Sequence, residues 1–184
     1  MITPLAKKKA IMAVIGFCVF AIVPFFFDVQ TMNWSVVIPL EIFYMVLLCH
    51  TYYAALLFSS LIPRENRLQS CIDALFVLIY FALANSIRFP VAYAIILAIL
   101  FTLGTLKYSN ALYTTGYPKL FKRKITIDTL GILLSIIVLV GFLLNLTVAS
   151  AWFLTIVFAI AGFILFFIYP LYSIKADQEI KSDI

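Results

Sequence analysis

Two ionisable side chains lie inside one long apolar stretch of the sequence, residues 39–63. Glu41 is the acid that the sequence places most clearly within a membrane, and His50 is the only histidine of the chain. Intramembrane carboxylates often mark proton or cation paths, and an imidazole changes its charge near neutral pH. The chemistry that these two residues indicate is therefore ion or proton binding inside a membrane.

Each of these residues also has a structural interpretation. Glu41 lies near one end of its apolar stretch, so its carboxylate could instead reach headgroup water or pair with Arg88. A single buried histidine such as His50 more often hydrogen-bonds a neighbouring helix. The chain has no second histidine and no Cys-x-x-Cys-His motif, so we expect no haem, no metal site and no other cofactor.

The helical period places the two ionisable residues on different faces. At about 100° per residue, His50 lies roughly opposite to a face that carries Glu41, Tyr44, Met45, Leu48, Tyr52, Ala55 and Ser59. An ionisable group facing lipid at mid-membrane costs about 2.5–3.5 kcal/mol or more. We therefore expect protein or water on both sides of this helix, at the centre of a bundle. Tyr44 and Tyr52 are candidates to line a polar path beside it.

Three further charged residues lie in or beside apolar runs: Asp73, Lys107 and Asp128. We expect each aspartate in the first turn of a helix, where it would cap free N–H groups; the alternative is a gate formed with the basic loops. Lys107 and Asp128 flank one basic loop at depths that differ by about 4.5 Å. The sequence therefore predicts a Lys107–Asp128 ion pair, and a matching hydrogen bond between Tyr52 and Asp73.

Long apolar runs must position these residues. The chain has 184 residues, of which 65% are hydrophobic and 11% charged, and this composition excludes a soluble domain. About 20 apolar residues cross a bilayer as a helix, which satisfies its own backbone in lipid. The sequence predicts one all-α integral membrane domain, a bundle of six transmembrane helices over residues 10–27, 34–62, 71–87, 90–113, 125–146 and 151–174.

The basic residues are distributed unevenly between the predicted loops. Three precede the first span, two lie in residues 63–70 and four in residues 114–124, whereas the loops on the other side hold only Arg88. Because cytoplasmic loops are rich in Lys and Arg, we expect both termini and both basic loops in the cytoplasm. The membrane would be the cell membrane, or the inner membrane of a prokaryote. This bias also explains the net charge of +5 without a nucleic-acid partner.

One internal similarity suggests a duplicated helical hairpin. Residues 53–64 align without gaps with residues 108–119, and the same register brings Asp73 onto Asp128. Both copies would have the same topology, as a parallel repeat. The alternative is that two hairpins that turn on the same side of a membrane independently share a proline, basic residues and an aspartate.

No motif of an enzyme is present: the sequence lacks Gly-x-Ser-x-Gly, His-Glu-x-x-His and a glycine-rich phosphate loop. The sequence instead predicts a small multi-pass transporter or channel-like protein with a polar path near residues 34–62. The alternative is a non-transporting membrane subunit or scaffold of a larger complex. A transporter should have a polar cavity that reaches Glu41 or His50, whereas a scaffold should have a solid core. Beside the lipid bilayer, a protein partner or a homo-oligomer stays open.

Overall fold

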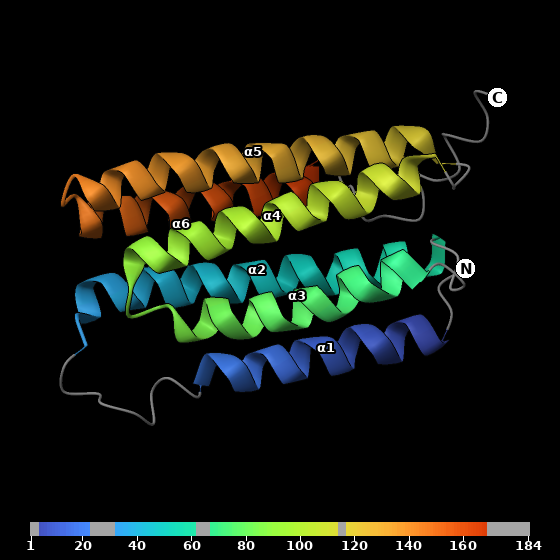
Figure 1. Cartoon of the computed structure of the whole chain (residues 1–184), viewed down its shortest axis with the longest axis horizontal. Coiled ribbons are helices and arrows are strands. Elements are labelled where there is room, and N and C mark those ends of the chain that lie inside the picture. Colours follow the sequence, from blue (N-terminus) through green and yellow to red (C-terminus); the bar gives the residue numbers. More distant parts are fainter. Residues whose placement is uncertain (1–3, 23–31, 62–66, 114–116, 169–184) are drawn as a thin grey trace.

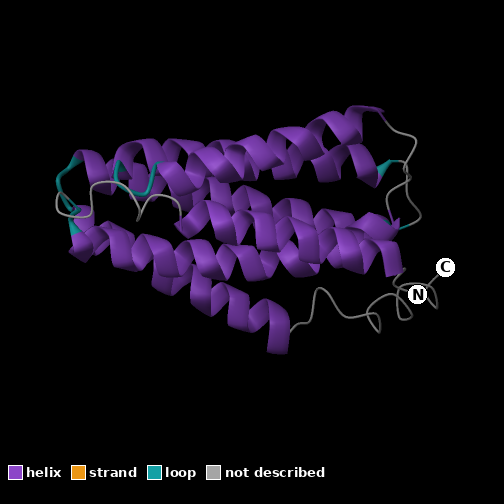
Figure 2. Cartoon of the chain, turned by 90° about the horizontal axis from the view of Figure 1, so that it is seen from below, coloured by secondary structure: helices purple, strands orange, loops and turns teal. Residues whose placement is uncertain are grey.

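The computed structural model describes residues 4–22, 32–61, 67–113 and 117–168, and these residues form helices and no strand. Successive helices run in opposite directions along the long axis of the molecule, and a view from below shows the same lengthwise packing (Figures 1 and 2). The elements are α1 (Pro4–Ile22), α2 (Trp34–Leu61), α3 (Arg67–Asn85), α4 (Pro90–Leu112), α5 (Pro118–Leu143), α6 (Thr147–Phe163) and a π-helix, η3 (Ile164–Ile168).

Four helices are long and apolar enough to cross a membrane: α2, α4, α5, and α6 together with η3. The other two contain shorter apolar stretches, Ala10–Ile22 in α1 and Gln69–Asn85 in α3. The prediction of an all-helical membrane protein is thus confirmed in its general form. The predicted ends of the first and sixth spans, residues 23–27 and 169–174, lie outside the described residues, as do residues 63–66 of the predicted basic turn 63–70, whose remaining residues belong to α3.

The largest difference from the predicted limits is the start of α5, which begins at Pro118 and not at residue 125. A proline suits the first turn of a helix, because that turn leaves its N–H groups without an intrahelical partner. The basic residues of segment 119–124 therefore belong to the helix and not to a loop. The predicted start of the fourth span at Pro90 is confirmed, since α4 begins at that proline.

Neither aspartate of the predicted hairpins caps a helix. Because α3 begins at Arg67 and α5 at Pro118, Asp73 lies in the second turn of α3 and Asp128 in the third turn of α5. The first turns of these two helices contain no acidic residue. The interpretation of both aspartates as helix caps is wrong, and their charges must be balanced in another way.

The helix α2 is the central element of the bundle. Half of its apolar window is buried, against 39% for α4 and 28% for both α5 and α6. Tyr44 of α2 donates its hydroxyl to the backbone oxygen of Phe17 in α1 at 3.2 Å. Tyr93 of α4 and Thr155 of α6 donate hydroxyls to backbone oxygens of α2, at 3.3 and 2.6 Å. The expectation that α2 has protein on more than one side is confirmed.

The six helices form two halves, α1–α3 and α4–α6, that meet along α3–α4 and α2–α6 (Figure 1). Within the second half, α4 and α5 pack closely along most of their length. Gly131 of α5 permits this approach, because a Cβ there would lie 2.6 Å from the ring of Phe101. In the first half, α2 and α3 approach each other closely at few points. The hairpin of α2 and α3 therefore packs differently from the hairpin of α4 and α5. The duplication of the hairpin stays a prediction.

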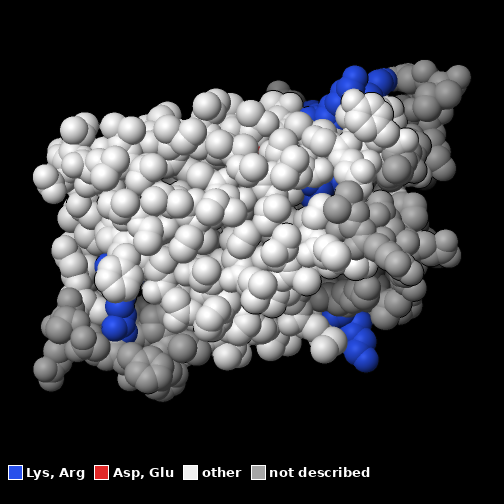
Figure 3. Space-filling model, viewed as in Figure 1, with Lys and Arg blue, Asp and Glu red and all other residues white. Residues whose placement is uncertain are grey.

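The basic side chains of the described residues gather mainly at one end of the bundle. Figure 3 shows them over the end where α1 and α5 begin, with a smaller group at the opposite end. The first end carries Lys7 and Lys8 of α1 and the basic residues of segment 119–124, and Arg88 lies in the turn between α3 and α4. No acidic side chain is visible on the face shown in Figure 3.

Candidate functional site, a cavity between the two halves

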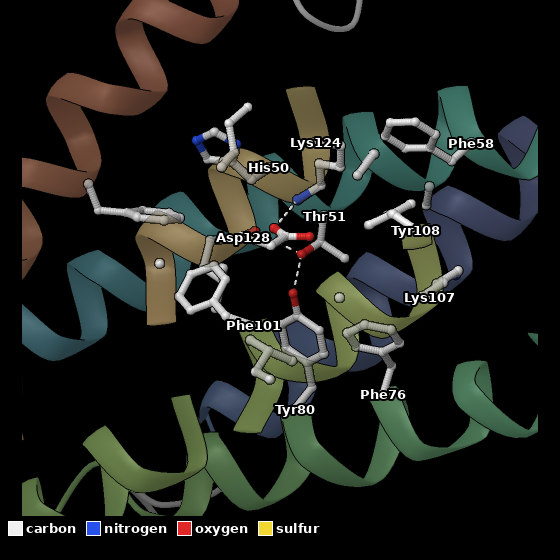
Figure 4. Close-up of a pocket in the computed structure, with 18 of the residues that line it drawn as sticks. His50, Thr51, Phe58, Phe76, Tyr80, Phe101, Lys107, Tyr108, Lys124 and Asp128 are labelled. Atoms are coloured by element: carbon white, nitrogen blue, oxygen red, sulfur yellow. Dashed lines mark hydrogen bonds and ion pairs between the residues drawn. The ribbon is translucent and has the colours of Figure 1, made fainter. Parts of the chain in front are cut away.

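A cavity of about 1030 Å³ lies between the two halves, and residues of all six helices line it. Its walls are mostly apolar and include aromatic rings from both halves, such as Phe76 and Phe101 (Figure 4). This size and this lining are typical of small-molecule sites, in which a few polar groups fix the orientation of a largely apolar ligand. The polar groups of this cavity come mainly from α2, α3, α4 and α5.

A buried ion pair forms one part of the polar wall. Lys124 and Asp128 lie one turn apart on α5, and Nζ of the lysine contacts Oδ1 of the aspartate (Figure 4). The side chains are only 12% and 3% exposed. The ammonium group also lies 5.3 Å from the centroid of the Tyr108 ring, as in a cation–π contact. Asp128 packs against Gly104 of α4, since a Cβ there would lie 2.7 Å from Oδ2.

A second ion pair joins the two halves at the edge of the cavity. Lys107 of α4 pairs with Asp73 of α3, whose side chain is 61% exposed. The same lysine lies 5.5 Å from the ring centroid of Phe76, and its backbone oxygen accepts a 3.2 Å hydrogen bond from Nε2 of Gln69. The predicted Lys107–Asp128 pair is therefore wrong, because α4 faces α3 across the halves at this point.

His50 lines the cavity, and its side chain is buried, at 8% exposed. Its ring lies 5.0 Å from that of Phe158 and 4.6 Å from that of Phe166. Gly162 of α6 makes room for it, because a Cβ on that glycine would lie 2.9 Å from Nε2. The next residue, Thr51, exchanges a hydrogen bond with the hydroxyl of Tyr80 on α3 (Figure 4).

Three other predicted site residues, Glu41, Tyr44 and Tyr52, do not line the cavity. Tyr44 is fully buried, and its hydroxyl links α2 to α1, so it has a structural role. The ring centroids of Tyr52 and Tyr53 lie 5.2 Å apart. The predicted hydrogen bond between Tyr52 and Asp73 is not formed, and Asp73 pairs with Lys107 instead.

The predicted pair of Glu41 with Arg88 is not confirmed, because no ion pair joins these two described residues. Oε2 of Glu41 is buried without a hydrogen-bond partner among the residues that the structure describes. Glu41 thus lies in the packed end of α2, outside the cavity. The predicted residues that the cavity does bring together are His50, Asp73, Lys107 and Asp128.

Sequence reasoning missed several polar residues of the cavity, chiefly Gln69, Lys124 and Tyr80. The spacing of Lys124 and Asp128 was an available signal, since residues four apart on a helix are neighbours. This signal was not used, because the sequence predicted a loop, and not a helix, over residues 114–124. Gln69 and Tyr80 carry no such signal, because only the packing of α3 on other helices turns them toward the cavity.

No family model, no curated protein and no solved structure matches this chain significantly. Within the described ranges, no three His, Cys, Asp or Glu side chains come together as a metal site would require. What the arrangement offers chemically is a large apolar cavity with hydroxyl, amide, imidazole and paired charged groups on its wall.

Proposed function

We propose that this protein is a small multi-pass membrane transporter or channel-like protein in which all six helices cross the membrane. The alternating direction of the helices supports six crossings (Figure 1). In the sequence the apolar run that includes α1 covers residues 10–27, and about 20 apolar residues are enough to cross a bilayer. The gathering of basic residues at the end where α1 and α5 begin supports a cytoplasmic location for that end and both termini.

The observation that carries the proposal is the cavity itself. Charged side chains within a membrane are costly and mostly line substrate or ion paths. Here the Lys124–Asp128 pair lies within the long apolar helix α5 and faces a space of about 1030 Å³. A scaffold should have a solid core, and a space of this size between the two halves departs from that expectation. The cavity therefore favours transport over the role of a non-transporting membrane subunit.

Cysteine accessibility tests this proposal without a known substrate. In a variant that lacks Cys18, Cys49 and Cys71, a single cysteine replaces Ala161, which lines the cavity on α6. A transporter exposes its cavity to each side of the membrane in turn, so a membrane-impermeant maleimide should label this cysteine from either side of reconstituted vesicles. Ala151, which is fully buried on the same helix and outside the cavity, provides the matched control.

Labelling of Ala161→Cys from one side alone would indicate a blind pocket, and labelling from neither side a closed core. Each of these results would contradict transport. Equal labelling of Ala151→Cys would show that the variants expose their interior for reasons unrelated to a path.

A further inference from the structure

One face of α5 carries both basic and apolar side chains. Lys122 and Arg123 lie near the start of the helix and are exposed. Leu130, Leu133 and Ile137 follow, and each of these three lines the cavity while more than half of its surface is exposed. At about 100° per residue, all five side chains fall within an arc of about 100° around the helix. A single face of α5 therefore leads from the basic end of the bundle to the cavity.

The cavity opens to the membrane between α5 and the end of α6. The two helices touch near the turn that joins them, where a Cβ on Gly141 of α5 would overlap Oγ of Ser150. Leu130 and Ile137 lie within about 40° of Gly141 around α5, so they are on the side next to α6. From the other side Ile164, the first residue of η3, lines the cavity and is 37% exposed. The opening therefore faces lipid at the level of these apolar side chains.

The basic part of this face lies at the level of the lipid headgroups. The helix α5 has 26 residues, and about 20 are enough to cross the hydrocarbon of a bilayer. Counted back from the opposite end of α5, the hydrocarbon begins at about residue 123, so Lys122 and Arg123 meet the headgroup region. At 1.5 Å per residue, Leu130 lies about 10 Å deeper than Arg123. An acyl chain whose headgroup is held at Arg123 passes this point.

Lys122 and Arg123 are suited to an anionic headgroup. No ion pair joins either of them to another residue in the described ranges. Cationic side chains at a membrane surface attract anionic lipids, and an arginine can bind a phosphate through two parallel hydrogen bonds. The orientation proposed above places this end of the bundle in the cytoplasmic leaflet, which carries the anionic lipids of a cell membrane.

The opening itself is suited to a hydrocarbon chain. Water is absent from the hydrocarbon region of a bilayer, so lipid chains are the molecules next to Leu130, Leu133 and Ile137. The cavity wall behind these residues is mostly apolar. An apolar space without atoms forfeits dispersion contacts along its wall, whereas a chain that enters it regains them. The face of α5 therefore offers contacts to both parts of one lipid.

We propose that this face of α5 binds one anionic phospholipid. Its phosphate lies between Lys122 and Arg123, and one acyl chain runs past Leu130 into the opening between α5 and α6. The site goes beyond the proposed function and does not depend on transport, since it requires only the exposed face of α5 and the cavity behind it. A zwitterionic lipid fits the opening equally well, but the two cations attract it less.

Quenching of tryptophan fluorescence by brominated lipids tests the headgroup and the chain together. Trp34 and Trp152 are replaced by phenylalanine, and Leu133→Trp places one reporter at the opening. The full chain is placed in phosphatidylcholine nanodiscs with a minor fraction of either phosphatidylglycerol or phosphatidylcholine that carries bromine on its acyl chains. We expect the brominated phosphatidylglycerol to quench this reporter with an apparent affinity about fivefold higher than that of brominated phosphatidylcholine.

Ile99→Trp provides the matched reporter. Ile99 is exposed on α4 and lies outside the cavity. At 1.5 Å per residue, Ile99 and Leu133 each lie roughly 20 Å from the end of their helix at the basic end of the bundle. The two reporters therefore have similar depths in the membrane, and both brominated lipids should quench Ile99→Trp equally.

Charge variants connect the preference to α5. Lys122→Gln combined with Arg123→Gln should abolish the preference for phosphatidylglycerol at Leu133→Trp. Lys7→Gln combined with Lys8→Gln removes the same charge from exposed positions of α1 at the same end, and it should leave the preference unchanged. Electron paramagnetic resonance of nitroxide-labelled lipids measures the same preference on the chain without a reporter tryptophan, and it serves if Leu133→Trp does not fold.

The proposal fails if both brominated lipids quench Leu133→Trp equally, or if the preference is as large at Ile99→Trp. It also fails if the two substitutions on α1 reduce the preference as much as the two on α5, because the net charge of that end would then explain it. Labelling of Ala161→Cys tests transport separately, so either proposal can be overturned while the other is retained.

Discussion

Lys107 of α4 forms its ion pair with Asp73 of α3, across the boundary between the two halves of the bundle. This contact and the hydrogen bond from Gln69 to the backbone of Lys107 connect the halves on one side of the cavity. Because Asp73 is largely exposed, water and headgroups screen the pair, and its contribution to the free energy of unfolding is modest.

A double-mutant cycle measures this contribution. We expect Lys107→Met and Asp73→Asn to show a coupling free energy of roughly 0.5–1 kcal/mol in unfolding experiments in mixed micelles. The same lysine substitution combined with Asp128→Asn provides the comparison and should show no coupling. A larger coupling with Asp128 than with Asp73 would contradict the arrangement of α3, α4 and α5 described above.

The buried pair on α5 should respond much more strongly. Lys124→Met leaves the carboxylate of Asp128 buried without its cation and should reduce the free energy of unfolding by about 3–5 kcal/mol. Adding Asp128→Asn removes that charge and should recover a large part of the loss. Lys122→Met, at an exposed position on the same helix, is the control and should change stability by less than about 0.5 kcal/mol. Equal losses for the two lysine variants would show that Lys124 is not buried.

Two glycines should respond to alanine in opposite directions. At Gly104 an added Cβ would lie 2.7 Å from Oδ2 of Asp128, so the carboxylate must shift, and Gly104→Ala should destabilise the protein by about 1–3 kcal/mol. At Gly16 of α1 an added Cβ meets nothing within 4 Å. Gly16→Ala should therefore stabilise the helix by about 0.5–1 kcal/mol. Thermal unfolding of both variants gives the comparison, and a Gly104→Ala variant as stable as Gly16→Ala would contradict the close approach at Gly104.

The hydroxyl of Tyr93 should contribute measurably to stability. It is the donor of a buried hydrogen bond to the backbone of α2, so Tyr93→Phe should reduce the free energy of unfolding by about 1 kcal/mol. Tyr113 is 88% exposed, and Tyr113→Phe should have almost no effect. If both substitutions were neutral in chemical unfolding, the link between α4 and α2 would not exist.

The proposed orientation predicts which side of the membrane each end of the bundle faces. In intact cells that express a cysteine-free background, an impermeant maleimide should label Asn145→Cys, in the turn between α5 and α6, from outside. It should label Lys122→Cys, at the opposite end of α5, only after the membrane is permeabilised. Reversed labelling would place the basic end outside and overturn the orientation.

The sequence predicted the helices well where local signals mark their ends. Pro90 set the start of α4, and the apolar run that follows determined its length. At α5 the same signal, Pro118, was outweighed by the run of basic residues after it, which resembled a loop. Lysines near a helix end can extend their side chains to the membrane surface, so a basic run does not exclude a helix.

The candidate site was predictable only in part, for a physical reason. His50, Asp73, Lys107 and Asp128 stand out because ionisable residues are rare in apolar runs. Their partners depend on which helices are neighbours, and that is decided by contacts between residues far apart in the chain. The contact between Gly104 of α4 and the carboxylate of Asp128 on α5 is one such long-range contact. The residues next to Gly104 in the sequence do not indicate it.

The contacts between α4 and α5 also determine how the bundle can move. Gly104 of α4 lies against the carboxylate of Asp128, and Gly131 of α5 lies against the ring of Phe101. The two helices therefore make close contact at two separate places. Sliding or rotating one helix over the other would force these atoms together. Helices α4 and α5 therefore form one rigid unit. The Lys107–Asp73 pair joins this rigid unit to α3 near the end of α4 that lies far from the turn of residues 86–89.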